Sequence, residues 1–493
     1  MFSVDAPPTA NGQPVLPAEV WAATPTAAQG LIVALLDVAQ QVTVLVAANA
    51  RLEARVRDLE ARLGQNSSNS SRPPSSDPPQ VPRRPPLAPT GRARGGQPGH
   101  VAHQRAPIPP ERVDRIVDHR PVACGHCAVA LPVAGEPDFV AHHVTEVPPL
   151  RAVVTEHRLH RLVCVACGRG TRAPLPLGVP AGAFGPRLQA TVATLSGVYH
   201  LSQRHVADVC SMVLDAPLAA SSVAGLCQAT AMALAEPVAT LQATLPSAPV
   251  ANADETRWPQ AGRTQWLWVV VTGLATVFTV ATSRGSRVIK DLLGEDYRGV
   301  LGSDRYAGYA WLDVAWRQVC WAHLLRDLQG LVDRGGDAQA VGTAALALVH
   351  DLFTIWHRYR AGALDRAGLS AAMQPIQDAF AGVLEEGARC PDAKAAGLCH
   401  ALDRLWPALW TFVDEDGVEP TNNAAERAIR PAVLWRKGSY GTQSDGGSRF
   451  VERLLTVTAT CRQQGRSVLD YLTTVCTAAR LGQPVPSLLP VTA

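Results

Sequence analysis

A run of apolar residues spaced alternately three and four positions apart is the strongest constraint that this sequence places on its fold. The run lies within residues 28–64 and holds for four heptads, at Leu35, Val38, Val42, Leu45, Asn49, Leu52, Val56, Leu59 and Leu63. This period predicts a long helix that pairs with a second helix in a coiled coil. Asn49 falls at an a position, where a buried Asn fixes the register of a parallel two-stranded coil. Arg55 and Glu60, at g and the following e, could pair across the two helices. We expect a dimerising coiled coil; a helix packed on its own chain is the alternative.

The length and charge of the chain indicate several modules and two basic surfaces. At 493 residues, with 47% hydrophobic residues, the chain predicts three or more modules with real cores. The net charge of +3 does not by itself indicate a nucleic-acid binder. Locally, however, residues 72–105 carry six Arg against one Asp, and residues 426–466 carry eight Arg or Lys against three acids. Phosphate backbones are natural partners for such surfaces.

The N-terminal half shows no targeting segment. Residues 1–27 lack a basic region followed by an apolar one, so they are not a secretory signal, and their Ala, Pro and Thr predict disorder. Leu31–Ala50 is apolar but is broken by Asp37, Gln40, Gln41 and Asn49, which makes a poor membrane span. Eleven Cys, an odd number, fit a reducing compartment. These features predict a cytoplasmic protein with no membrane partner.

Two Cys-x-x-Cys pairs predict a structural zinc site within residues 111–180. Cys124 and Cys127 are separated by 36 residues from Cys164 and Cys167. Four thiolates on two such turns match the closed tetrahedral site that Zn²⁺ prefers. A redox pair or free thiols are the alternatives. Before this module, residues 65–110 are rich in Ser, Pro, Arg and Gly and predict a basic linker, which either orders on DNA or is a passive tether.

The remaining sequence predicts a helical region, then an α/β region, then further helices. Residues 184–245 are expected to be helical, and Leu201–Cys210 followed by Ser221–Ala231 resembles a helix-turn-helix, with Ser221 and Ser222 as N-caps. Residues 246–332 predict an α/β core with four strands, at Pro249–Asp254, Trp266–Thr272, Ala275–Thr282 and Gly299–Asp304, and two helices, at Ser286–Leu293 and Cys320–Val332. A helical insertion is expected at 333–415, then a second part of the core with C-terminal helices at 416–482 and a tail at 483–493.

Three acids carry the candidate chemistry. Cleavage of a phosphodiester by two Mg²⁺ or Mn²⁺ ions requires carboxylates from separate elements that converge on one point. Asp254 is expected at the end of an apolar strand, Asp304 at the end of another, and Glu426 at the start of a helix. An acid in any one of these positions is more commonly a turn or surface residue. The assignment of the three acids as metal ligands depends on their order and sequence context.

These motifs, in this order, resemble the transposases of the insertion-sequence-66 family over nearly the whole chain. The matching segments are Leu63–Asp77, Gly95–His100, the two Cys pairs, Ala253–Thr256, Ser303–Tyr306, Cys320–His323, Asn422–Arg427, Arg430-Pro431 and Arg436-Lys437. The resemblance implies a ribonuclease-H-like catalytic core interrupted by a helical insertion, with Asp254, Asp304 and Glu426 as the acids that bind two metal ions. It also implies a coiled coil, a zinc module and a helix-turn-helix-like region ahead of the core. Glu255 would point to the opposite face of its strand.

Further residues support this interpretation. Asn423, three residues before Glu426, could orient it, and His323 could lie near the metals or simply pack. Four basic residues on the same segment are suited to bind phosphate: Arg427, Arg430, Arg436 and Lys437. The alternative is a solvated basic face with no partner. Cys320 is expected to be buried. The tryptophans at 258, 266 and 268 are expected in the core, although Trp258 could stack on a displaced base.

The predicted function is therefore DNA transposition. The protein would bind terminal inverted repeats and target DNA as a homodimer or higher oligomer, cut the 3′ ends and join them to the target, with small accessory proteins as possible partners. We expect it in the bacterial cytoplasm, at the nucleoid. A regulator that no longer cuts and a nuclease without strand transfer are the rivals; the presence of all three acids disfavours the first, and the long N-terminal half disfavours the second.

Overall fold

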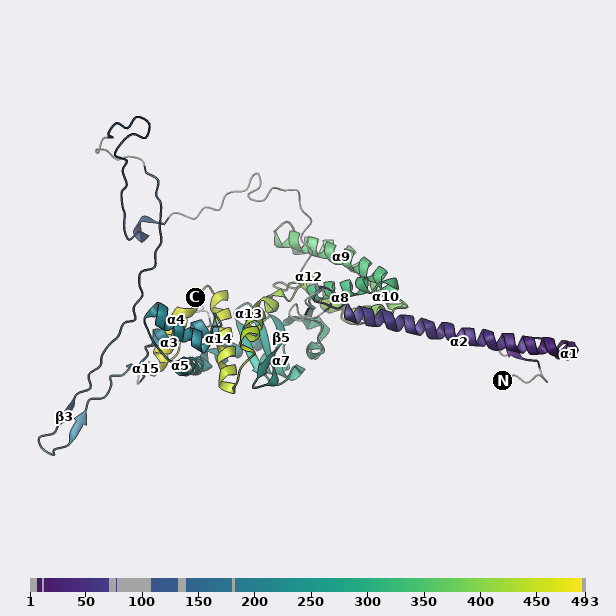
Figure 1. Ribbon diagram of the computed structural model, residues 1–493, viewed down its shortest axis with the longest axis horizontal. Helices are drawn as coiled ribbons and strands as arrows, with labels where there is room; N and C mark the ends of the chain where they lie inside the picture. The colour runs from purple at the N-terminus through teal and green to yellow at the C-terminus, as the bar shows by residue number, and fades with distance from the viewer. Residues whose placement is uncertain are drawn as a thin grey trace.

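The structure is a computed structural model that describes residues 7–10, 13–70, 77, 108–131, 139–179 and 182–489. Within them, a five-stranded sheet and its covering helices form the centre of a mixed α/β fold (Figure 1). A long N-terminal helix projects from one side of this centre, and the extended chain that carries the Cys pairs lies on the other. The basic segment 72–105 and the motif Gly95–His100 lie outside the described residues, apart from Asp77.

The heptad segment forms a single helix, α2 (Thr26–Leu63), as its period predicts. It follows Pro25 and ends at Gly64, whose N–H bonds the carbonyl of Glu60. The seam side chains are exposed, with Leu45 at 66% and Leu52 at 64%, so the helix does not bury its apolar stripe on its own chain. By length and apolar composition α2 would also be long enough to cross a membrane, despite its four polar interruptions, and so would α9 (Gly336–Arg360). The pairing of α2 in a coil stays a prediction.

The C-terminal end of α2 docks on α8 (Trp321–Arg334). Asp58 pairs with Arg334 at 3.7 Å, and Asn69 Nδ2 donates to Asp333 Oδ2 at 2.7 Å. A cleft of about 860 Å³ lies between these segments, and Arg305 is among its lining residues. The first part of the sequence predicted to be a linker is therefore an ordered contact with α8.

The first 27 residues differ in part from the expected disorder. Their described part contains a short strand pair, β1 (Thr9–Ala10) with β2 (Gln13–Pro14), and a helix, α1 (Ala18–Ala23). Trp21 is buried, and Gln29 Nε2 donates to its carbonyl oxygen at 2.7 Å. This hydrogen bond links the end of α1 to the first turn of α2.

Four short helices precede the sheet: α3 (Pro186–Gly197), α4 (Gln203–Leu214), α5 (Ala220–Ala233) and α6 (Ala235–Gln242). The helical pair expected here is formed by α4 and α5, which pack together. The predicted N-caps of α5 are wrong. Ser221 and Ser222 lie in its first turn, because the helical bonding begins at Ala219, whose carbonyl accepts from the N–H of Val223.

The central sheet has the strand order β7-β6-β5-β8-β9. Its strands are β5 (Val250–Gln260), β6 (Arg263–Thr272), β7 (Thr276–Ala281), β8 (Val300–Ser303) and β9 (Arg317–Val319). The first three are antiparallel, and β8 and β9 run parallel to β5. Ala261 and Gly262 join β5 to β6 with φ of 49° and 76°, the two-residue turn with positive φ that matches strand twist.

Helix α14 (Asp445–Gln463) covers the edge strand β7 and satisfies its backbone. Glu452, Thr456 and Thr460 accept hydrogen bonds from the N–H groups of Val280, Phe278 and Thr276 at 3.0, 2.9 and 3.2 Å. Four helix residues rise about 6 Å and two strand residues about 6.6 Å, so the two spacings match. The edge is thereby closed to another chain. Helix α7 (Ser286–Leu293), as predicted, joins β7 to β8, and α15 (Val468–Leu481) packs on α3.

The helices after α8 form a second hydrophobic core. They are α9, α10 (Arg366–Ala388), α11 (Ala393–Asp403) and α12 (Trp406–Asp414). Trp321, Phe380 and Trp410 pack together at its centre, and α12 contacts β9. Helix α13 (Asn423–Ser439) then returns to the sheet against β5. The helices between 333 and 415 therefore separate Glu426 from the two Asp in sequence but not in space.

Candidate active site

The register of β5 and β8 places Asp254 and Asp304 beside each other. Asn252 pairs with Gly302 at the end of the parallel ladder, and each Asp lies two residues beyond its member of this pair. Because side chains alternate along a strand, Asp254 lies on the same face of the sheet as Asn252, and Asp304 follows directly after the last residue of β8. The expected end of the strand at Asp254 is wrong, since β5 continues to Gln260 and pairs with β6 throughout.

Burial raises the pKa of both carboxyl groups. For Asp254 the rise is large, and the neighbouring charges of Glu255, Asp304 and Glu426 add to it. For Asp304 burial is again the main cause, while a hydrogen bond from the N–H of Tyr306 at 2.9 Å acts in the opposite direction. Buried carboxylates that repel one another have a strong need for a cation.

Helix α13 brings Glu426 close enough to Asp254 and Asp304 for their charges to interact, although the described carboxylates of the three acids are not gathered within 4.8 Å of one another. Its first-turn position puts the side chain near the positive end of the helix dipole. His323 Nδ1 lies 3.3 Å and Arg326 Nη2 3.6 Å from Glu426 Oε1. Burial raises the pKa of Glu426, Arg326 lowers it, and the charge of Asp304 raises it. The three acids therefore interact electrostatically in one site.

Asn422 fixes α13 to β5, and sequence reasoning missed it in favour of Asn423. Its side chain is buried and donates from Nδ2 to the carbonyl oxygen of Ala253 at 2.7 Å. Its backbone N–H lies 3.1 Å from Cys320 Sγ. The Asn-Asn doublet ahead of Glu426 was the available signal. Asn423, half-buried at the start of α13, stays a predicted supporting residue.

Glu255 has partners of its own. Arg284 Nη2 lies 2.8 Å from its Oε1, and the hydroxyl of Tyr309 donates to Oε2 at 2.5 Å. The side chain of Glu255 is 2% exposed, and burial raises its pKa while Tyr309 and Arg284 lower it. This paired carboxylate is less available to a metal ion than Asp254.

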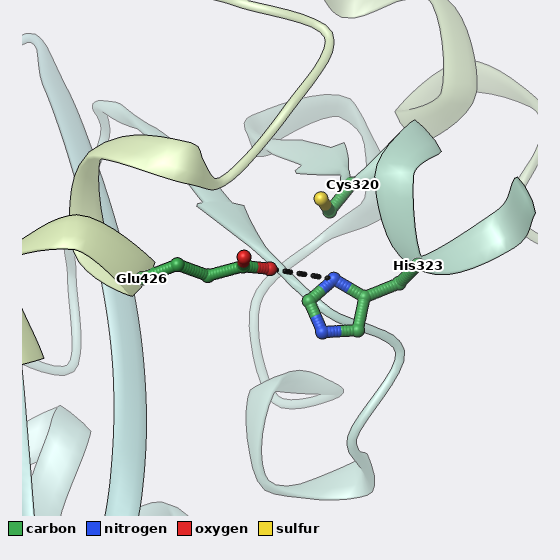
Figure 2. A group of neighbouring side chains, drawn as sticks. All are labelled: Cys320, His323 and Glu426. Atoms are coloured by element: carbon green, nitrogen blue, oxygen red, sulfur yellow. Dashed lines mark ion pairs between the residues drawn. The ribbon is translucent and has the colours of Figure 1, made fainter. Parts of the chain in front are cut away.

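Cys320 and His323 come from the start of α8 and face Glu426 (Figure 2). Cys320 is 1% exposed, as expected, and burial raises the pKa of its thiol to about 11. Burial and two nearby Arg lower the pKa of His323 to about 3, so its imidazole is neutral. The predicted position of His323 near the acids agrees with this contact.

The predicted DNA-contact residues divide into two kinds. Arg427, Arg430 and Lys437 are exposed on α13. Arg436 is instead half-buried and donates from Nη1 to Thr256 Oγ1 at 2.9 Å and to the carbonyl of Arg257, so it fastens α13 to β5. Contacts of these four residues with phosphate stay a prediction.

The tryptophans of the sheet are mostly core residues. Trp258 and Trp268 are fully buried, and Trp258 Nε1 donates to Thr442 Oγ1 at 3.2 Å. Trp258 packs edge-on against Trp435. Its suggested stacking on a displaced base is wrong, because no ring face is free to receive one. Trp266 is half-buried, with the guanidinium of Arg284 4.9 Å above its ring.

The two Cys pairs each form a tight turn, but the structure does not bring them together. The carbonyls of Cys124 and Cys164 accept from the N–H groups of Ala128 and Gly168, both at 2.9 Å. The second turn lies between β3 (Arg161–Val163) and β4 (Gly170–Arg172). Backbone N–H groups lower the pKa of Cys124 and of Cys164, which favours thiolates. Among the described residues, the four sulfurs are not gathered into one metal-binding group. Each turn fits two zinc ligands, and the four-sulfur site stays a prediction.

The donor set at the acids fits divalent cations. Asp254, Asp304 and Glu426 offer hard oxygen atoms in a partly buried site, and Glu426 Oε1 has no hydrogen-bond partner. Oxygen atoms are the ligands that Mg²⁺ and Mn²⁺ prefer.

Comparison with known proteins identifies the family. The family model described as Transposase IS66 family matches residues 181–449, more than half of the chain. The chain belongs to the IS66 family of transposases. A second model, described as a family of unknown function (DUF6444), matches residues 17–106. Two similar proteins of Sinorhizobium fredii, both named as uncharacterized, are y4qI, 28% identical over 48% of this chain, and y4hP, 26% identical over 71%.

The IS66 match covers the sheet, all three acids and the helices between them. The alignments span about half the length of y4qI and 69% of y4hP. Membership of the IS66 family suggests an insertion-sequence transposase, and enzymes of this kind commonly use divalent metal ions.

Proposed function

We propose that the protein is a DNA transposase that cleaves and joins DNA strands with two divalent metal ions held by Asp254, Asp304 and Glu426. The observation that supports this proposal is the register of β5 and β8, since Asp254 and Asp304 each lie two residues beyond the paired Asn252 and Gly302 and their charges, with that of Glu426, are coupled. We further propose that the central sheet is the ribonuclease-H-like core of this enzyme class.

Each residue of the site would have a separate role in strand cleavage and joining. Bound Mg²⁺ or Mn²⁺ ions would activate the attacking oxygen, neutralise phosphate charge and stabilise the leaving oxygen. Asp254 and Asp304 would hold the ions from the sheet, and Glu426 would hold them from α13. Arg427 and Arg430, exposed beside Glu426, would neutralise neighbouring phosphates. The site would cut the 3′ end of the element and then use the freed hydroxyl to attack target DNA.

The modules ahead of the sheet would recognise and align DNA. The exposed apolar seam of α2 supports a coiled-coil dimer that holds two element ends. The packed pair α4 and α5, together with the Cys module folded around structural Zn²⁺, would recognise the terminal inverted repeats. The protein would act on the bacterial nucleoid in the cytoplasm, with small accessory proteins as further partners.

The proposal is tested with a labelled duplex that carries an element end. We expect the wild type to nick and join it in Mg²⁺ or Mn²⁺, and Asp304→Asn to retain binding but lose both steps. Asp313→Asn removes an exposed acid nine residues away and serves as the matched control. Equal cleavage by wild type and Asp304→Asn would contradict the assignment. Binding without cleavage by the wild type would favour the regulator, and nicking without joining would favour the nuclease.

A further inference from the structure

Three donor atoms of different chemistry meet at one edge of the candidate active site. Cys320 Sγ, His323 Nδ1 and a carboxylate oxygen of Glu426 lie within 4.8 Å of one another, and no other such group occurs among the described residues (Figure 2). Cys320 immediately precedes α8, and His323 is in its first turn, so the spacing of three puts both on one side of the helix. Glu426 faces them from the first turn of α13.

We propose that Cys320, His323 and Glu426 form a binding site for a borderline transition-metal ion such as Zn²⁺ or Co²⁺. This inference rests on the proposed function, because Glu426 would be shared with the catalytic metal ions. It adds to that function a thiolate and an imidazole, two ligand types that Mg²⁺ does not favour.

The spacing of His323 and Glu426 fits such an ion. Two ligands that are each ~2.0–2.1 Å from a tetrahedral ion lie about 3.3 Å apart. His323 Nδ1 and Glu426 Oε1 are 3.3 Å apart. Three protein ligands would leave the fourth position of the ion open, as in catalytic rather than structural zinc sites.

Two polar atoms of this site have no hydrogen-bond partner and are free to bind an ion. His323 Nδ1 and Glu426 Oε1 are both buried without a hydrogen-bond partner. A buried polar atom without a partner destabilises the folded state, and an ion between these two would satisfy both. The backbone N–H of Asn422, 3.1 Å from Cys320 Sγ, would stabilise the thiolate form. Asn422 also bonds the carbonyl of Ala253, so it links Cys320 to the strand that carries Asp254.

The positive charges of Arg326 and Arg305, which both act on His323, oppose binding. Arg326 Nη2 is 3.6 Å from the same Glu426 oxygen, and its positive charge repels a cation. We therefore expect weaker binding than at a closed four-ligand zinc site.

The test uses Co²⁺ as the probe, because a cobalt–thiolate bond has its own charge-transfer absorption. The protein is the full-length chain with Cys124, Cys127, Cys164 and Cys167 changed to Ser, so that the Cys turns cannot contribute. We expect the thiolate band and the visible bands of four-coordinate Co²⁺, with Cys320→Ser abolishing the thiolate band. His323→Gln should weaken Co²⁺ binding at least ~10-fold. Cys461→Ser, at an equally buried cysteine, should change neither.

The outcomes separate this site from the proposed catalytic function. Absence of the thiolate band, or its persistence in Cys320→Ser, would overturn the site, whether or not the protein cleaves DNA in Mg²⁺. A band that Cys320→Ser removes and Asp304→Asn retains would support the site even if no metal ion supported cleavage. If Cys320→Ser does not fold, His323→Gln decides: unchanged Co²⁺ affinity in a folded variant would contradict the proposal.

Discussion

The side-chain amide of Asn422 donates to the carbonyl oxygen of Ala253 at 2.7 Å, across 169 positions of sequence. Ala253 immediately precedes Asp254, and Asn422 immediately precedes α13, which carries Glu426. This buried hydrogen bond therefore links the strand that carries Asp254 directly to the helix that carries Glu426.

We expect Asn422→Ala to reduce cleavage on the order of 100-fold, because loss of this bond lets Glu426 move relative to Asp254. The variant also leaves a buried carbonyl without its donor, which should lower stability by about 1–3 kcal/mol. Single-turnover nicking and thermal unfolding measure the two effects. Asn423→Ala, at the half-buried neighbour, is the control. A larger loss of nicking in Asn423→Ala than in Asn422→Ala would show that Asn423 is the supporting residue.

Glu452 gives the sheet a predictable pH dependence. Burial raises its pKa, against the opposing effects of the Val280 N–H and Arg449. A raised pKa in the folded state means that the stabilising contribution is full below the unfolded value, near 4.5, and is lost as pH rises through the folded value. Glu452→Gln keeps an acceptor for Val280 but cannot ionise. The melting temperature of wild type relative to this variant should therefore fall as pH rises from 4.5, whereas a rise would show that Arg449 dominates.

Gly330 tests the docking of residues 65–70 on α8. A Cβ at this position would lie 2.6 Å from the carbonyl oxygen of Asn69. In a free helix Gly→Ala stabilises by roughly 0.5–1 kcal/mol, but here it should displace the docked segment. We expect faster amide hydrogen exchange at 66–70 in Gly330→Ala. Gly382→Ala in α10, where a Cβ meets nothing within 4 Å, is the matched control. Equal exchange in the two variants would show that this contact does not persist in solution.

The exposed seam of α2 predicts dimerisation. Leu45 and Val44 are similarly exposed in the single chain, at 66% and 63%, but only Leu45 lies at a d position. Leu45→Glu should shift the protein towards monomer in analytical ultracentrifugation, because it buries a charge in the coil interface, and Val44→Glu should not. A wild-type monomer, or an equal effect of both changes, would contradict the coiled coil.

Local pattern was sufficient for the helices and for most of the sheet. The heptad period of α2, the β-branched runs of β6 and β7 and the amphipathic α7 are each encoded within a dozen or so neighbouring residues. The end of β5 was predicted too early, because Thr256–Gln260 has no apolar alternation and is held by pairing with β6. Similarly, β9 was missed, since the polar pair Arg317-Gln318 is buried only through contacts with β8 and α12.

The three acids and His323 were selected by motif, but the hydrogen bonds that join their elements could not be predicted from the sequence. The bonds of Asn422 to Ala253 and of Arg436 to Thr256 join residues more than 160 positions apart, which no periodicity describes. The same is true of the partners of Glu255, whose position inside a strand gave no sign of an ion pair with Arg284. Contacts of this kind depend on the returning path of α13 and on the sheet register.

The most direct test of the catalytic account is strand transfer of a pre-nicked element end by wild type and Glu426→Gln, in Mg²⁺ and in Mn²⁺. Glu419→Gln, a partly exposed acid paired with Arg360 just before α13, is the matched control. The account predicts at least about a 1000-fold loss in Glu426→Gln alone, about 4 kcal/mol of transition-state stabilisation, with DNA binding unchanged. Strand transfer by Glu426→Gln at the wild-type rate would show that Glu426 is not the third catalytic acid.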